Sequence, residues 1–205
     1  MIIELCGIDG SGKGTVIELL SNEFPHMIEI LNPLRDGLTV TELKKIAQKQ
    51  DQSIYDLKAN NLVSSSYLVD LLYMMERKMK EKTDKKIFLC DRYTTCLKVY
   101  SAIGKVEKKL VEILSEKAPK SDLIIYMDVE PQIALNRIHA RGIKKTYKEK
   151  LEIMEKAKTL YQSHLEKIDN KSKFIINNDG NFEQLQVQVM PIIEEMRDEV
   201  IKKTI

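Results

Sequence analysis

The first twenty residues combine residue types that bind phosphate groups. An apolar run at 2–6 leads into the glycine-rich segment 7–14, GIDGSGKG, and an apolar-periodic stretch then begins at Thr15. A strand, a glycine-rich turn and a helix in this order can surround a phosphate with backbone N–H groups. Lys13 would add a mobile positive charge for the outer phosphates. We prefer this interpretation to an ordinary turn, because the motif, its context and the lysine all agree.

The residues predicted to contact the phosphates are contiguous in this loop. They are Gly10, Ser11, Gly12, Lys13, Gly14 and Thr15. In the usual pattern a Ser or Thr directly after the lysine binds Mg²⁺, but here Gly14 occupies that place. Direct ligation of the metal by Thr15, a water-mediated metal and a contact of Thr15 with phosphate therefore remain open.

Charged residues follow a later apolar strand as well. Asp91, Arg92 and Tyr93 come directly after the apolar run at 87–90. A carboxylate beside a phosphate site can order Mg²⁺ and its waters, and a guanidinium can bridge phosphates with fixed donor geometry. A solvated strand end is the alternative, and neither role is specific to one reaction.

A second pair of basic residues ends a predicted helix. Arg137 and Arg141 are four residues apart, so a helix would place them on one face. Phosphoryl transfer spreads negative charge over the moving group, and a mobile arginine-bearing lid can neutralise it and exclude water. We predict such a lid at about 141–150, with Gly142 as a hinge. The lysines within this segment fit a solvated face equally well.

Composition limits the class of protein. The chain has 205 residues, 43% of them hydrophobic and 31% charged, which suits one domain over 1–205. Its 33 Lys and Arg against 31 Asp and Glu leave a net charge of +2, so nucleic acid is not the expected partner. We find neither an apolar run long enough to cross a bilayer nor a signal-peptide pattern. A cytoplasmic enzyme that is not bound to a membrane is the simplest expectation.

Strand and helix patterns alternate along the chain. Strands are predicted at 2–6, 27–31, 87–90, 123–129 and within 173–177. Helices are predicted at 15–23, 39–48, 51–82, 94–102, 106–117, 131–141, 151–168 and 182–200. This alternation indicates a three-layer α/β/α fold with a five-stranded parallel sheet, and ligands of such sheets bind at the carboxyl ends of the strands. Gly7, Asp91, Arg92 and Asp128 all fall near such ends.

With these residues assembled, the chain resembles the thymidylate kinase family of P-loop nucleoside monophosphate kinases over nearly its whole length. Four blocks in order carry the resemblance, namely GIDGSGKGT, LCDRYTTCLKVY, IYMDVEPQIALNRIHAR and the helix from Glu149 to Tyr161. The resemblance implies a P-loop NTPase fold, ATP and Mg²⁺ as cofactors, and phosphoryl transfer to a pyrimidine nucleoside monophosphate, with dTMP first. It also suggests a homodimer.

The resemblance assigns roles to the predicted site residues. Lys13 and the loop amides would hold the β- and γ-phosphates, and Asp91 would organise Mg²⁺ indirectly. Arg92 would contact the acceptor or the transferred phosphate. Asp9 would orient the acceptor sugar. Arg137 and Arg141 would clamp the phosphates, and Tyr100 would lie beside the deoxyribose.

The chain departs from the family in the acceptor region. The family's Arg-Glu-Pro-Gly-Gly run is replaced by Leu31 to Arg35, and only Arg35 or Lys44 could replace its acceptor-phosphate arginine. By this resemblance Tyr67 takes the place of the family's stacking phenylalanine, and Asp70 or Leu71 takes the place of the arginine that reads thymine. Two alternatives therefore stay open: a kinase of a nucleoside or modified nucleotide, and a regulatory protein that binds nucleotide without transfer.

Overall fold

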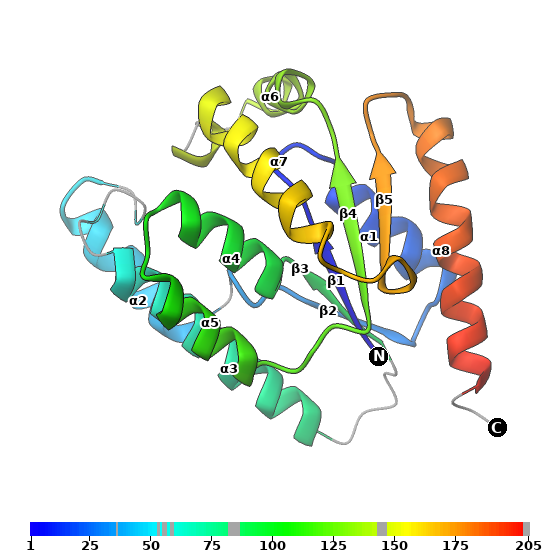
Figure 1. Cartoon of the computed structure of the whole chain (residues 1–205), viewed down its shortest axis with the longest axis horizontal. Coiled ribbons are helices and arrows are strands. Elements are labelled where there is room, and N and C mark those ends of the chain that lie inside the picture. Colours follow the sequence, from blue (N-terminus) through cyan, green and yellow to red (C-terminus); the bar gives the residue numbers. More distant parts are fainter. Residues whose placement is uncertain are drawn as a thin grey trace.

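The computed structural model describes residues 1–35, 37–52, 54, 57, 60–81, 87–142 and 147–202. Its strands form one parallel sheet in the order β2-β3-β1-β4-β5 (Figure 1). The strands are β1 (Ile2–Cys6), β2 (Ile28–Leu31), β3 (Ile87–Asp91), β4 (Leu123–Asp128) and β5 (Lys173–Asn177). The five-stranded parallel sheet predicted from the sequence is therefore confirmed.

Helices cover both faces of this sheet. They are α1 (Lys13–Glu23), α2 (Leu38–Lys49), α3 (Asn60–Lys80), α4 (Thr94–Ile103), α5 (Lys108–Lys117), α6 (Pro131–Ala140), α7 (Leu151–Leu165) and α8 (Phe182–Lys202). Short 3₁₀ turns lie at Tyr147–Glu149 and Asn170–Ser172. Side chains of α1 and α8 pack on one face of the sheet, and those of α2, α3, α4, α6 and α7 pack on the other. The predicted three-layer α/β fold is confirmed.

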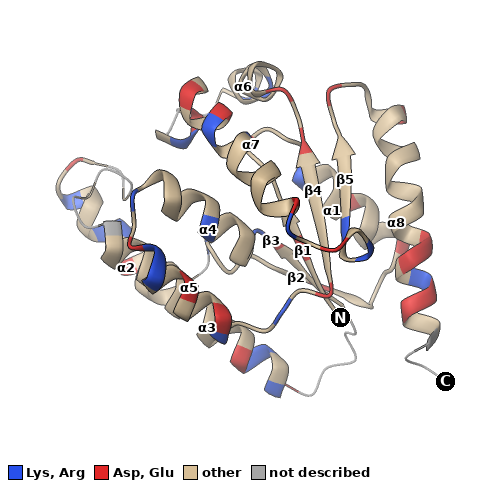
Figure 2. Ribbon diagram, viewed as in Figure 1, with Lys and Arg blue, Asp and Glu red and all other residues tan. Residues whose placement is uncertain are grey.

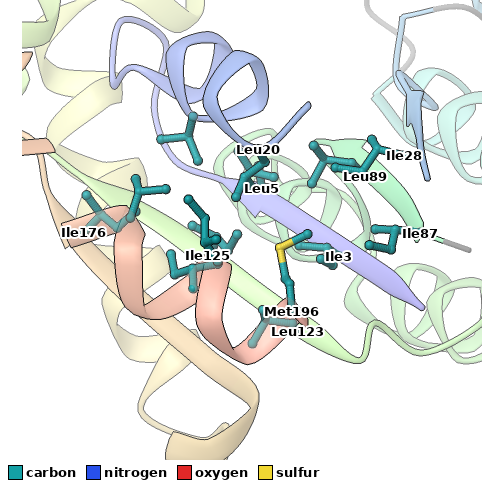
Figure 3. Packing of buried hydrophobic residues seen from close by; sticks show 14 of the residues in the cluster. Ile3, Leu5, Leu20, Ile28, Ile87, Leu89, Leu123, Ile125, Ile176 and Met196 are labelled. Carbon is teal, nitrogen blue, oxygen red and sulfur yellow. The ribbon is translucent and has the colours of Figure 1, made fainter. Parts of the chain in front are cut away.

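The central strand β1 leads directly into the phosphate loop and is buried on both faces. All of its residues are buried. Ile3 and Leu5 face α1 and α8 in one hydrophobic cluster, together with Leu89 and Ile125 from the neighbouring strands (Figure 3). Cys6 faces the opposite layer. Burial on both faces is the reason that this strand reads as an apolar run rather than an alternating one.

One predicted helix begins later than expected. The apolar periodicity placed a helix at 51–82, but residues 51 and 52 form a turn and α3 begins at Asn60. Asp51 has a left-handed φ of 51°, and the N–H of Gln52 donates to the carbonyl of Ala47 at 3.1 Å. This contact closes the carboxyl end of α2, so the predicted start at Asp51 was wrong. Hydrophobic periodicity could not reveal this helix end, because it indicates which residues are buried and not which backbone hydrogen bonds end a helix.

Charged residues are distributed over the outer surface. Acidic and basic residues both lie along α3, α5 and α8, and most charged residues in the carboxyl-terminal half of α8 are acidic (Figure 2). Several are paired along one helix, for example Lys80 with Glu76 at 2.6 Å. Among the residues that the structure describes, no helix is both long enough and apolar enough to span a bilayer.

Candidate active site

The glycine-rich loop joins the carboxyl end of β1 to the N-terminus of α1, and its glycines are sterically required. Gly12 has a φ of 92°, and a Cβ there would lie 2.2 Å from Nδ2 of Asn178. Gly10 has a φ of 78°, and its Cβ would lie 2.4 Å from the carbonyl oxygen of Ala134. A side chain at either position would clash with this packing. The resulting loop, with a helix N-terminus behind it, fits the phosphates of a nucleotide.

Lys13 lies at the start of α1 with its ammonium against the loop. Nζ donates to the carbonyl oxygens of Gly7 at 3.2 Å and Ile8 at 2.7 Å, and to Oγ of Ser11 at 3.3 Å. The residue is only 7% exposed. Burial first, and the charge of Arg92 second, lower the pKa of Lys13 to about 8. The structure therefore places a buried positive charge where the outer phosphates would bind.

Arg92 connects β3 to this loop. Its guanidinium forms an ion pair with Asp9 and donates to the carbonyl of Gly7 at 3.3 Å. Burial acts to raise the pKa of Asp9, but Arg92 and Lys13 overcome it and lower that pKa to about 2. Arg92 has a left-handed φ of 71°, and its N–H donates to Leu5 at 3.0 Å. A bulky residue in this conformation is strained, and such strain is concentrated at functional sites.

Three adjoining cavities open around Arg92, which lines all of them. The phosphate cavity is lined by the glycine-rich loop with Asp91 and Arg141. The middle cavity is lined mainly by polar residues, among them Asp9, Arg35 and Lys44. The apolar pocket lies between α3 and α4 and has a cavity volume of about 90 Å³. A ligand with phosphate and apolar parts could occupy all three.

Asp91 provides a test of the expected Mg²⁺. Its buried Oδ1 has no hydrogen-bond partner among the described residues, and Asp91 lines the phosphate cavity together with Thr15. No group of three or more His, Cys, Asp or Glu that could hold a metal occurs in the described ranges. Mg²⁺ that arrives with nucleotide phosphates needs only one or two protein carboxylates and keeps several waters. The residues present therefore fit a nucleotide-bound Mg²⁺.

The middle cavity collects charged residues from five parts of the chain. Both candidates for an acceptor-phosphate contact line it, Arg35 from the loop after β2 and Lys44 from α2. Nζ of Lys44 donates to the carbonyl of Arg35 at 3.3 Å, so the two residues are neighbours. Lys148 and Glu149, which follow the undescribed residues 143–146, also line this cavity.

Aromatic residues contribute to the lining of the apolar pocket. Tyr67 from α3 and Tyr100 from α4 both line it. Nζ of Lys148 lies 4.5 Å from the ring centroid of Tyr100, and Cζ of Arg92 lies 5.8 Å from it. Tyr161 packs edge-on against Tyr100 with centroids 6.4 Å apart, which fixes the ring from behind. Two of the predicted substrate residues, Tyr67 and Tyr100, are therefore brought together.

Asp70 lies outside these three cavities. Its carboxylate oxygens accept the backbone N–H groups of Thr39 at 3.0 Å and Val40 at 2.9 Å. It is 3% exposed. These contacts cap the N-terminus of α2 from a neighbouring helix. The substrate contact predicted for Asp70 has no support in this geometry.

The two arginines predicted to form a clamp have different environments. Arg141, just after the helix α6, lines the phosphate cavity, and its role in a clamp stays a prediction. Arg137 does not line it, because its Nη2 donates to the carbonyl of Gly180 at 3.3 Å in the turn after β5. Asp128, at the end of β4, pairs with Lys158 at 3.3 Å and does not line the phosphate cavity. The predicted lid lysines Lys144 and Lys145 lie outside the described residues.

Two polar residues that support the site were not found from the sequence. Asn178 is 7% exposed, and its Nδ2 donates to the carbonyl of Ser11 in the phosphate loop at 2.9 Å. Glu4, inside β1, accepts the backbone N–H of Thr95 at 2.9 Å and its hydroxyl at 3.0 Å. Signals existed for both, because Asn178 follows the fifth strand and Glu4 interrupts an apolar run.

Comparison with known proteins agrees with this geometry. A family model described as thymidylate kinase matches residues 5–189. A probable thymidylate kinase of Pyrobaculum aerophilum is 30% identical over 156 residues, which cover 76% of this chain and 78% of the relative. A thymidylate kinase of Bacillus cereus is 25% identical over 204 residues and covers 95% and 97% of the two chains.

A solved structure also matches the whole chain. It is described as deoxyadenosine kinase from M. mycoides with products dCMP and a flexible dCDP bound. The TM-score is 0.64 with 17% identity, and the alignment covers 97% of this chain and 100% of that one. At this identity the likeness shows the shared fold. With a family match over residues 5–189 and a phosphate loop, a strand-end Asp-Arg pair and an aromatic pocket in place, the chain belongs to the thymidylate kinase family of nucleoside monophosphate kinases.

Proposed function

We propose that the protein transfers the γ-phosphoryl group of ATP to a pyrimidine deoxynucleoside monophosphate, with dTMP as the first substrate. The observation that carries this proposal is the placement of Arg92, which lines the phosphate cavity, the middle cavity and the apolar pocket at once. Donor phosphates, acceptor phosphate and nucleoside would then lie in sequence around one guanidinium. Membership of the thymidylate kinase family supports the same reaction.

The donor phosphates would be held by the loop and by α1. The loop N–H groups, the N-terminus of α1 and the ammonium of Lys13 all lie at the phosphate cavity. Asp91 and Thr15 would hold the waters or the ion of the Mg²⁺–ATP complex. Bound Mg²⁺ neutralises charge on the phosphates.

The chain's own contribution to transfer would be positioning and charge neutralisation. Arg92 would contact the transferred or acceptor phosphate, while its partner Asp9 orients the acceptor sugar. Arg141 would neutralise charge on the phosphates. Arg137 would join this clamp only by leaving its contact with Gly180. No covalent intermediate is needed for such a reaction.

We also propose that the segment 141–150 acts as a lid. Its described ends support this idea, because Arg141 borders the phosphate cavity and Tyr147 borders the apolar pocket. Lys148 and Glu149 border the middle cavity between them. Closure of such a segment would exclude water from the transfer step.

A monophosphate acceptor is favoured over a free nucleoside. Arg35 and Lys44 place two cationic side chains in the middle cavity, between the phosphate loop and the apolar pocket. A nucleoside without phosphate would leave these two cationic side chains without a ligand group to contact. The alternative of a nucleoside or modified-nucleotide kinase therefore ranks second.

The direct test is coupled ADP release with ATP, Mg²⁺ and each of dTMP, dUMP, UMP, CMP, AMP, GMP and thymidine. We expect acceptor-dependent turnover with dTMP. Turnover with thymidine alone would favour the nucleoside kinase. ATP binding in calorimetry without any acceptor-dependent ADP release would instead favour a regulatory nucleotide-binding protein. A cytoplasmic location and a homodimer remain predictions, and sedimentation tests the latter.

A further inference from the structure

Two serine hydroxyls face each other in the apolar pocket. Ser64 from α3 and Ser101 from α4 both line it, and their Oγ atoms lie 3.3 Å apart within hydrogen-bond distance. Ser101 is only 3% exposed. The pair joins residues 37 positions apart in the sequence. Hydroxyls in such a setting are either a link between two helices or a means of recognising a ligand.

The position of the pair in the pocket points to recognition of a base. α4 begins at Thr94, beside Arg92, and Ser101 lies seven residues further along the helix. At the helical rise per residue this is a distance of about 10 Å. Val63 and Val106 line the same pocket. A nucleotide with its phosphate at Arg92 would therefore extend its base toward the two serines.

The hydroxyls of Ser64 and Ser101 can take more than one hydrogen-bonding direction. Arg92 is paired with Asp9 at the phosphate end, and Lys148 lies over the ring of Tyr100. A serine hydroxyl can donate or accept, because it turns about its C–O bond. Thymine and uracil present an N–H between two carbonyls, whereas cytosine presents a ring nitrogen acceptor beside an amino group. Rotating hydroxyls can satisfy either edge, unlike a guanidinium, which only donates.

We propose that Ser64 and Ser101 read the hydrogen-bonding edge of the base, and that the site accepts dCMP as well as dTMP. This inference rests on the proposed function. A site built from fixed donors rejects the wrong base strongly because its own groups are left unpaired, and a site built from rotating hydroxyls avoids that penalty. Apolar contact with the thymine methyl group would leave only a modest preference for dTMP over dUMP.

The first test compares kcat/KM for dTMP, dUMP and dCMP at saturating ATP and Mg²⁺. We expect dCMP to fall within about tenfold of dTMP, the factor that one ordinary hydrogen bond supplies. Discrimination against dCMP by a thousandfold or more, with dTMP turned over, would overturn the inference and leave the proposed function intact. Absence of turnover with every monophosphate would overturn the proposed function itself.

The second test uses Ser64→Ala and Ser101→Ala. Each should raise KM for dTMP and dCMP roughly five- to tenfold, while KM for ATP stays unchanged. Ser64→Thr keeps the hydroxyl and should retain most of the activity. The matched control is Ser66→Ala on the same helix, whose hydroxyl donates to the carbonyl of Leu62 at 2.8 Å and does not line the pocket.

A purely structural role for the pair predicts a different result. In that case Ser64→Ala and Ser101→Ala would lower the melting temperature without changing KM for any acceptor. A lower melting temperature with unchanged KM would overturn base reading by the two serines. The same conclusion would follow if Ser64→Ala and Ser101→Ala had the same KM values for the acceptors as the Ser66→Ala control.

Discussion

Lys13 is the residue whose removal should affect the reaction most directly. We expect Lys13→Ala to lower kcat/KM for ADP release by roughly a hundred- to a thousandfold, because one electrostatic contact to the transferred phosphate is lost. The measurement is coupled turnover with dTMP, with melting temperature as a check of folding. Lys45→Ala is a suitable control, since Lys45 is an exposed lysine paired with Glu42 on α2. Normal turnover by Lys13→Ala would contradict the proposed mechanism.

Gly14 is the second position where one residue can be tested. A Cβ at Gly14 would meet no atom within 4 Å, and the residue lines the phosphate cavity. We expect Gly14→Ser to fold and to lower the Mg²⁺ concentration for half-maximal activity, because it adds an oxygen beside the metal site. Gly14→Ala is the matched control with the same backbone change and no oxygen. Identical Mg²⁺ titrations of the two variants would show that this position does not reach the metal.

At the scale of elements, Glu4 links β1 to the start of α4. Burial raises the pKa of Glu4 from 4.5 to about 7, despite its hydrogen bonds with Thr95. Between these values the folded protein keeps a proton that the unfolded chain has lost. This contribution to stability is present below pH 4.5 and is lost as the pH rises through 7.

The corresponding experiment uses Glu4→Gln, which cannot ionise. Its amide oxygen can accept the backbone N–H of Thr95, and its amide N–H can donate to the Thr95 hydroxyl. We expect the free energy of unfolding of wild type to fall relative to the variant between pH 4.5 and 8, by on the order of 3 kcal/mol. Urea unfolding at both pH values measures this difference. A constant difference between the two proteins would mean that Glu4 does not titrate in this range.

The contact between α2 and α3 gives a second prediction at this scale. Asp70→Ala leaves two N–H groups at the start of α2 without a partner and should destabilise the protein by about 1–2 kcal/mol. At a temperature where the variant is folded, its KM for dTMP should equal that of wild type. A specific rise in that KM, with unchanged stability, would restore the substrate contact predicted from the sequence.

For the whole molecule, the arrangement of the cavities predicts which ligand each basic residue binds. Arg141 lines the phosphate cavity and Lys44 lines the middle cavity. A ligand that binds only the folded state stabilises it by about 2.7 kcal/mol at a hundred times its Kd. We therefore expect Arg141→Ala to weaken the thermal protection by a non-hydrolysable ATP analogue, and Lys44→Ala to weaken that by dTMP. Equal losses for both ligands in either variant would contradict the assignment.

Local sequence patterns were enough to predict the phosphate loop, the parallel sheet and the residues at its binding edge. The phosphate loop is one contiguous segment, so its residue types and the strand and helix beside it could be recognised together. The alternation of strands and helices predicted the parallel sheet, and strand ends located Asp91 and Arg92 at its binding edge. These features depend on the order of neighbouring residues, which a sequence displays directly.

Only the tertiary structure decided which distant residues meet. Asn178 supports the loop at Ser11 across 167 positions, and Ser64 meets Ser101 across 37. Asp70 caps a different helix instead of facing the pocket. The physical reason is that such contacts depend on which strands are neighbours and how helices pack. Residue spacing within one element cannot report these arrangements.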